Sequence, residues 1–90
     1  MTGDQKKLAL DAELARGDDG IEEAELLFAA SKLAGAVSRA YYGAFHYARA
    51  LLITVGEEPR SHNGLTRLLQ RDFVRTSRLA PEVAALLSRD

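Results

Sequence analysis

Apolar residues recur at intervals of three and four along the sequence, and this spacing leaves little room for any structure other than helices. In the first third of the chain these positions are Leu8, Leu10, Leu14, Ile21, Ala24, Leu27 and Phe28. Such spacing is typical of an amphipathic helix, whereas a strand requires strict alternation. Leu and Ala, both good helix formers, dominate the composition, and only two prolines interrupt the 90 residues. The sequence therefore predicts an all-α protein.

The first half of the chain reads as two long helices. One is predicted over residues 4–31, because its apolar stripe continues in phase across Gly17 and Gly20. After a short turn, the second is predicted over residues 36–55, with Gly56 as a favourable residue at its C-terminal end.

The second half of the chain predicts shorter helices. One spans residues 64–74, with Ser61 or Asn63 as its N-cap, and another begins at Pro81, which suits the first position of a helix. The simplest fold is an antiparallel up-down helical bundle of two long and two or more short helices.

A chain of this size forms one domain, residues 1–90, with a small core of its own. Cysteine is absent, which excludes disulfides and thiolate zinc sites, and the two histidines are too few for a structural metal site. We therefore expect no cofactor and no metal, and a partner subunit as the added source of stability.

The location of the protein is predicted from two features. The start, MTGDQKK, has no apolar run that would make a signal peptide. The longest apolar run, near ALLITV, is far shorter than a membrane span. We expect a soluble, cytoplasmic protein that has no contact with a membrane.

Charge is distributed unevenly along the chain. Residues 1–38 contain eight acidic and four basic residues, a net charge of −4, whereas residues 39–90 contain eight arginines and five acidic residues, a net charge of +3. Ordinary solvated helix faces explain such a pattern, and so does a basic half that meets phosphate.

The helix predicted over residues 36–55 has two faces of different character. The predicted intrachain core consists of Tyr41, Ala44, Ala48, Leu51 and Val55, with Phe45 and Leu52 at its edge. The opposite stripe consists of Arg39, Gly43, His46, Ala50 and Ile53, with Tyr42 and Arg49 beside it. This second stripe combines small residues, which permit close backbone approach, with two ionisable side chains on one face, roughly 10 Å apart along the axis.

In so short a chain we expect no further helix to cover this second stripe. A twofold-symmetric homodimer through Gly43, Ala50 and Ile53 would cover it and would bring two copies of Arg39 and His46 together. The alternative is structural: Arg39 pairs with a carboxylate of the first helix, and His46 forms a local hydrogen bond.

At this point a family resemblance appears. SRAYYGAFHYARALL (residues 38–52), followed by SHNG (residues 61–64) and FVRTSRL (residues 73–79), resembles the HEPN family of prokaryotic helical proteins. The resemblance covers about residues 5 to 85. Members carry an Arg, four to six intervening residues and a His, and here Arg39 and His46 are separated by six.

The resemblance implies a bundle of four or five helices that dimerises through the motif face. It implies a metal-independent ribonuclease that acts as a toxin or defence effector, and a small nucleotidyltransferase that acts as its antitoxin. Members usually continue into another long helix, so a sequence that stops at Asp90 is either a fragment or a naturally short member.

Two positions depart from the family's pattern. The best-studied members have a polar residue directly after the motif Arg, where this chain has Ala40. Some toxin members have a Tyr two positions after the His, which receives a nucleotide from the antitoxin. Here that position is Ala48, although Tyr47 lies next to His46.

The chemistry of RNA cleavage without a metal suits Arg39 and His46. A base must take the proton of the 2′-OH, an acid must protonate the leaving 5′-oxygen, and a cation must stabilise the charged phosphorane. Histidine can serve both proton roles near neutral pH, and arginine offers a fork that matches phosphate oxygens. We therefore predict Arg39 and His46 as catalytic residues.

Other residues are predicted to contact RNA or a nucleotide: Tyr42, Tyr47, Arg49, Arg67 and Arg71. Arg67, Arg71 and Arg75 form a basic ridge, which is either a solvated face or a track for an RNA backbone. His62 is interpreted as a capping or packing residue of its loop.

Two functions remain open from the sequence. One is a dimeric endoribonuclease toxin of a toxin–antitoxin pair. The other is a non-catalytic helical partner of a nucleotidyltransferase, which binds nucleotide or the partner protein at the cleft of Arg39 and His46. Ala40 favours the second, and the presence of both motif residues on one face favours the first.

Overall fold

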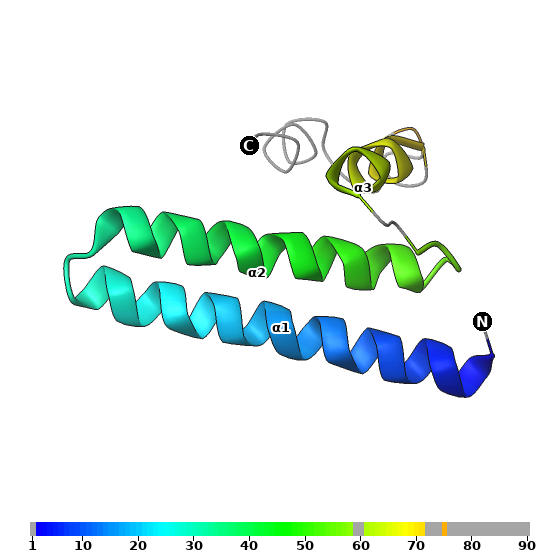
Figure 1. Cartoon of the computed structure of the whole chain (residues 1–90), viewed down its shortest axis with the longest axis horizontal. Helices are drawn as coiled ribbons and strands as arrows, with labels where there is room; N and C mark the ends of the chain where they lie inside the picture. Colours follow the sequence, from blue (N-terminus) through cyan, green and yellow to red (C-terminus); the bar gives the residue numbers. More distant parts are fainter. Residues whose placement is uncertain (1, 59–60, 72–74, 76–90) are drawn as a thin grey trace.

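The computed structural model describes residues 2–58, 61–71 and 75, and this part of the chain contains three helices and no strand (Figure 1). They are α1 (Gly3–Ala29), α2 (Leu33–Ile53) and α3 (His62–Leu69). The all-α prediction is therefore confirmed for the described residues. The helix expected to begin at Pro81 lies outside them, so the full up-down bundle stays a prediction.

Helix α1 is one continuous helix of 27 residues, as the phase of its apolar stripe predicted. Its N-terminus is fixed by a capping box, in which the backbone N–H of Gln5 donates to Thr2 Oγ1 and the backbone N–H of Thr2 donates to Gln5 Oε1. The chain reverses at Ser31, whose φ of 61° permits a tight turn.

Helix α2 begins at Leu33, three residues before the predicted start. The turn after its C-terminus contains Gly56 with a φ of 82°, a conformation that glycine adopts without strain. Lys6 Nζ of α1 donates to the carbonyl of Thr54, 3.1 Å away, and so ties the start of α1 to the end of α2.

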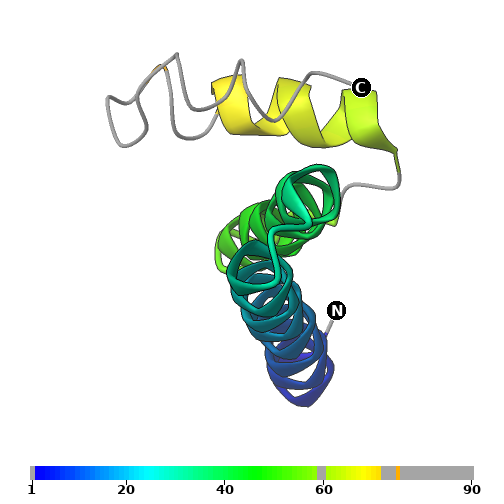
Figure 2. The same cartoon turned by 90° about the vertical axis from the view of Figure 1, so that its left-hand side faces the viewer.

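Helices α1 and α2 form an antiparallel hairpin and lie side by side along most of their length (Figures 1 and 2). Glycines allow the two backbones to touch. A Cβ atom placed on Gly20 would lie 2.7 Å from Gly43 Cα, and one on Gly43 would lie 2.9 Å from the carbonyl oxygen of Gly17. Real Cβ contacts do not come that close to backbone, so this crossing requires glycine on both helices.

This crossing corrects the prediction that the stripe of Gly43, Ala50 and Ile53 lacks an intrachain partner. Gly43 contacts α1 directly, and Ala50 and Ile53 are each only 3% exposed within the single chain. The small residues do mark a close helix–helix contact, but its partner is α1 and not a second subunit. These three residues are therefore not available as a dimer interface.

Helix α3 packs across the opposite side of α2, away from α1 (Figure 2). Ala48 and Leu52 of α2 form a buried cluster with Leu65 and Leu69, and the partly buried residues around it are Ala44, Phe45 and Leu68. Ser61 caps α3, since its Oγ accepts from the backbone N–H of Gly64 at 2.9 Å. Of the two caps that the sequence left open, Ser61 is the one observed.

The predicted core stripe of α2 is therefore only half right. Ala48 and its neighbours are covered by α3, but Leu51 and Val55 remain exposed in the described part of the chain. Both lie on the flank of α2 between the faces that α1 and α3 cover. Helix α2 is consequently the central layer of the described residues, with α1 on one side and α3 on the other.

Candidate functional site

One flank of α2 holds an open hollow that contains both motif residues. It has a volume of about 470 Å³ and is lined by Ser38, Arg39, Tyr41, Tyr42, Phe45 and His46. The helical repeat explains the grouping, because residues seven apart lie on one side of a helix two turns apart. The prediction that Arg39 and His46 share a face is confirmed by this arrangement.

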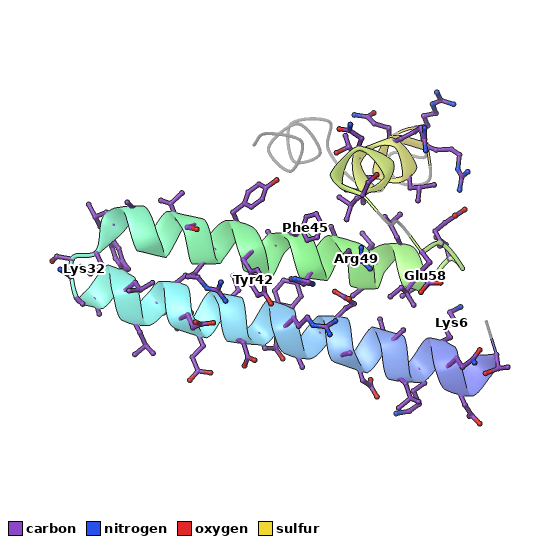
Figure 3. The ribbon with its side chains drawn as sticks, viewed as in Figure 1. Lys6, Lys32, Tyr42, Phe45, Arg49 and Glu58 are labelled. Carbon is purple, nitrogen blue, oxygen red and sulfur yellow. The ribbon has the colours of Figure 1, made fainter. Side chains whose placement is uncertain are left out.

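Tyr42 lies between the two motif residues and touches both. Figure 3 labels Tyr42 and its neighbour Phe45 on α2. The guanidinium carbon of Arg39 lies 4.1 Å from the centre of the Tyr42 ring, a cation–π arrangement. The rings of Tyr42 and His46 meet edge to face, with their centres 4.4 Å apart. Phe45 makes a similar edge contact with His46 at 5.5 Å.

Arg39 has a partner on α1, as the structural alternative anticipated. Its Nη2 donates to Glu23 Oε1 at 2.8 Å, and about a third of the side chain is exposed. Its Nε is buried and has no hydrogen-bond partner among the residues that the structure describes. An incoming acceptor could reach only the exposed part of the guanidinium, not this buried atom.

His46 faces a buried carboxylate that sequence reasoning missed. Its Nδ1 lies 2.5 Å from Glu13 Oε2, and Glu13 is only 6% exposed. The other oxygen, Oε1, receives Arg16 Nη1 at 2.9 Å and lies 3.4 Å from Arg49 Nε. Glu13 therefore joins three basic side chains, two from α2 and one from α1.

The pKa of Glu13 results from opposing influences. Burial raises it, but the hydrogen bond from His46 and the charges of His46 and Arg49 lower it by more, so the net pKa lies below the ordinary value of 4.5. The Glu13 carboxylate is consequently ionised at neutral pH.

This lowered pKa predicts how the stability of the fold depends on pH. A carboxyl whose folded pKa is depressed contributes stability above its unfolded pKa and loses that contribution as the pH falls through its folded pKa. The melting temperature of Glu13→Gln should therefore lie below that of wild type at pH 7. The gap should narrow as the pH falls below 4.5. Thermal melts of both proteins across this range provide the measurement, and a gap that stays constant down to pH 2 would contradict the assignment.

A sequence signal for Glu13 did exist. Glu13, Gly17, Gly20 and Ala24 are the buried positions of α1 and follow the three-and-four spacing of one helix face. An acid on a face of small, buried residues needs a charged partner, because a lone buried charge is costly. The sequence could not identify that partner, which lies 33 residues away.

The other residues predicted to bind RNA or a nucleotide lie in different places. The Tyr47 hydroxyl donates to Asp18 Oδ1 at 2.5 Å, and this hydrogen bond raises the pKa of Tyr47. Arg49 lies beside the Glu13 carboxylate, together with Arg16 and His46. Arg67 is exposed on α3, and Arg71 pairs with Glu57, so neither lines the hollow. The side chain of His62 and any role of residues 72–74 lie outside the described part.

None of the described helices combines the length and the apolar character that a membrane span requires. Residues 2–58, 61–71 and 75 also contain no group of three or more His, Cys, Asp or Glu side chains placed to hold a metal ion.

Comparison with known proteins places the chain in a family. The model of the HEPN domain matches residues 12–89, and the chain therefore belongs to the HEPN family. The match includes α2 and the hollow of Arg39 and His46 described above.

Three similar proteins come from three different organisms. A UPF0332 protein of Pyrococcus horikoshii is 42% identical over 57 residues, which are 63% of this chain and 40% of that protein. A protein of Methanocaldococcus jannaschii named "Putative toxin" is 30% identical over 77 residues, 86% of this chain and 52% of that protein. A UPF0332 protein of Thermotoga maritima is 31% identical over 74 residues, 82% of this chain and 56% of that protein.

The chain spans about half the length of the curated relatives it matches. No solved structure gives a significant match.

Proposed function

We propose that this HEPN domain is a metal-independent endoribonuclease toxin that cleaves RNA with Arg39 and His46. The observation that carries the proposal is the hollow on α2, where Arg39, Tyr42 and His46 line one open surface. About a third of the Arg39 side chain is exposed, so its guanidinium can offer charged donors to a phosphate oxygen. The name "Putative toxin" of two relatives from Methanocaldococcus jannaschii supports a toxin role.

The reaction would proceed by attack of the RNA 2′-oxygen on the adjacent phosphorus. His46 takes the 2′-OH proton, the P–O5′ bond breaks, and a proton is delivered to the departing 5′-oxygen. Arg39 stabilises the negative charge that accumulates on the phosphorane. The products are a 2′,3′-cyclic phosphate and a 5′-hydroxyl.

A homodimer about the hollow would complete this site. One protomer supplies a single His46, whereas the reaction uses both a base and an acid. Because Gly43 contacts α1, the dimer proposed here uses the flank of Arg39, Tyr42 and His46 in place of the glycine stripe. The toxin would be neutralised by a nucleotidyltransferase antitoxin that binds the same protein.

A second function rests on the Arg39–Glu23 pair. An arginine already held by a carboxylate at 2.8 Å has less freedom to clamp a phosphate, and Ala40 supplies no polar group next to it. A non-catalytic partner of a nucleotidyltransferase, which binds nucleotide or protein at this hollow, accounts for both facts.

The two functions are separated by one assay. Purified protein is incubated with RNA in EDTA, and the product ends are identified. The proposal expects cleavage that persists in chelator and leaves 2′,3′-cyclic phosphates. Intact RNA, together with a stable complex between the protein and a nucleotidyltransferase encoded beside it, would favour the non-catalytic partner.

A further inference from the structure

We propose that Glu13 is a positioning residue that fixes His46 with Nδ1–H turned toward α1, so that Nε2 alone serves the hollow. The inference deepens the proposed function and rests on it for the role of His46 in proton transfer. The carboxylate comes from a different helix, so the α1–α2 hairpin itself builds this arrangement.

The geometry leaves Nδ1 with a single role. It lies 2.5 Å from Glu13 Oε2, which is within hydrogen-bonding distance. The carboxylate is ionised and accepts two further cations, Arg16 and Arg49, through its other oxygen. An ionised carboxylate has no proton to donate, so the hydrogen of this contact must reside on Nδ1.

The imidazole ring has little freedom to turn away from this contact. His46 is about 15% exposed, and the rings of Tyr42 and Phe45 pack edge-on against it. The carboxylate cannot turn easily either, because Arg16 and Arg49 hold its second oxygen. Since Nδ1 points into the α1–α2 contact, Nε2 lies on the side of the ring that faces the hollow.

This arrangement makes Nε2 the atom through which each His46 exchanges a proton, as the base in one protomer and as the acid in the other. When the ring is neutral, Nδ1 carries the hydrogen and Nε2 has the free electron pair that a base needs. When the ring is protonated, Nε2 carries the second hydrogen and can donate it to a leaving oxygen. Without Glu13, the neutral ring could carry its hydrogen on Nε2 and would lose its function as a base.

Nitrogen-15 NMR of the histidine rings tests the inference without any need for activity. Two-bond ¹H–¹⁵N correlations distinguish the protonated ring nitrogen from the bare one, and a His62→Gln variant identifies the signals of His46. We expect neutral His46 in wild type to be protonated at Nδ1, and Glu13→Ala to shift the population toward the Nε2–H form. A wild-type ring protonated at Nε2 would overturn the inference.

Two further variants make the test decisive. Glu13→Gln is nearly isosteric and serves if Glu13→Ala does not fold; its amide can accept or donate, so we expect a mixture of tautomers. Glu23→Gln changes a different carboxylate of α1, the one that pairs with Arg39, and should leave the His46 tautomer unchanged. A ring that remains fully Nδ1-protonated in both Glu13 variants would show that another group selects the tautomer.

RNA cleavage then separates this inference from the proposed function. Glu13→Ala should reduce kcat by about 10²-fold, the lower end of what a proton-transferring side chain contributes, with little change in KM, because it alters the state of the base and not the binding of RNA. If wild type does not cleave RNA but shows the Nδ1–H ring, the positioning role stands and the ribonuclease function fails. If wild type cleaves RNA and Glu13→Ala cleaves equally well, the positioning role fails alone.

Discussion

Replacing His46 by alanine should reduce the rate of RNA cleavage by about 10²- to 10⁴-fold, the usual contribution of a proton-transferring side chain. Arg39→Ala should cost about 10²- to 10³-fold, because it removes the charge that faces the phosphorane. The measurement is the rate of cleavage of a defined RNA in EDTA. Both substitutions should lower kcat, so the loss of cleavage rate should persist at saturating concentrations of RNA.

Controls for this first prediction come from the same chain. Lys7→Ala removes an exposed charge that pairs with Asp11 on α1, away from the hollow, and it should leave the rate unchanged. Thermal melts establish that each variant is folded. If folded His46→Ala and Arg39→Ala cleave RNA as fast as wild type, these residues are structural and the hollow is not a catalytic site.

Gly20→Ala should destabilise the protein by about 1 to 3 kcal/mol, although alanine is the better helix former. The added Cβ would lie 2.7 Å from the backbone of Gly43, which cannot move aside as a flexible side chain could. For a domain of this size, each kcal/mol corresponds to a fall in Tm of about 4–8 °C.

Gly3→Ala is the matched control for this second prediction. It makes the same change in the same helix at a position where a Cβ meets nothing within 4 Å. Its Tm should stay near that of wild type or rise slightly. Equal Tm values for Gly20→Ala and Gly3→Ala would mean that the two helix backbones do not touch at Gly20.

Local patterns made the helices predictable. The phase of the apolar stripe correctly carried α1 through Gly17 and Gly20, because a glycine weakens a helix without changing its periodicity. The turn at Gly56 was predictable for a similarly local reason, since glycine adopts the positive φ found there. The boundaries of α1 and α2 differ from the predicted ones by up to three residues, as at Leu33. The third helix, predicted over residues 64–74, spans His62–Leu69 in the structure.

The assignment of faces failed because periodicity shows which residues lie together but not what covers them. The sequence correctly predicts that the stripe of Gly43, Ala50 and Ile53 makes a close helix–helix contact. The predicted partner, a second subunit, is wrong, because the stripe meets α1. The matching glycines at positions 17 and 20 of α1 were the missing clue, since a backbone contact needs small residues on both helices.

The candidate site was predictable only in part: the sequence places its two motif residues together but does not identify their partners. Arg39 and His46 share a flank because they are seven residues apart on one helix, and this geometry follows from the sequence alone. Their carboxylate partners, Glu23 and Glu13, lie 16 and 33 residues away in the chain. Which acid meets which base depends on the register of α1 against α2, and the glycine crossing sets that register.

The most direct test of the account is to map where RNA binds. A short 2′-O-methyl RNA, which cannot be cleaved, is titrated into ¹⁵N-labelled protein, and the shifts of the backbone amides are followed by NMR. The account predicts that the largest changes fall on the residues around the hollow, which are Ser38, Arg39, Tyr42, Phe45 and His46. Changes confined to α3 around Arg67 and Arg71, with the α2 hollow unaffected, would contradict it.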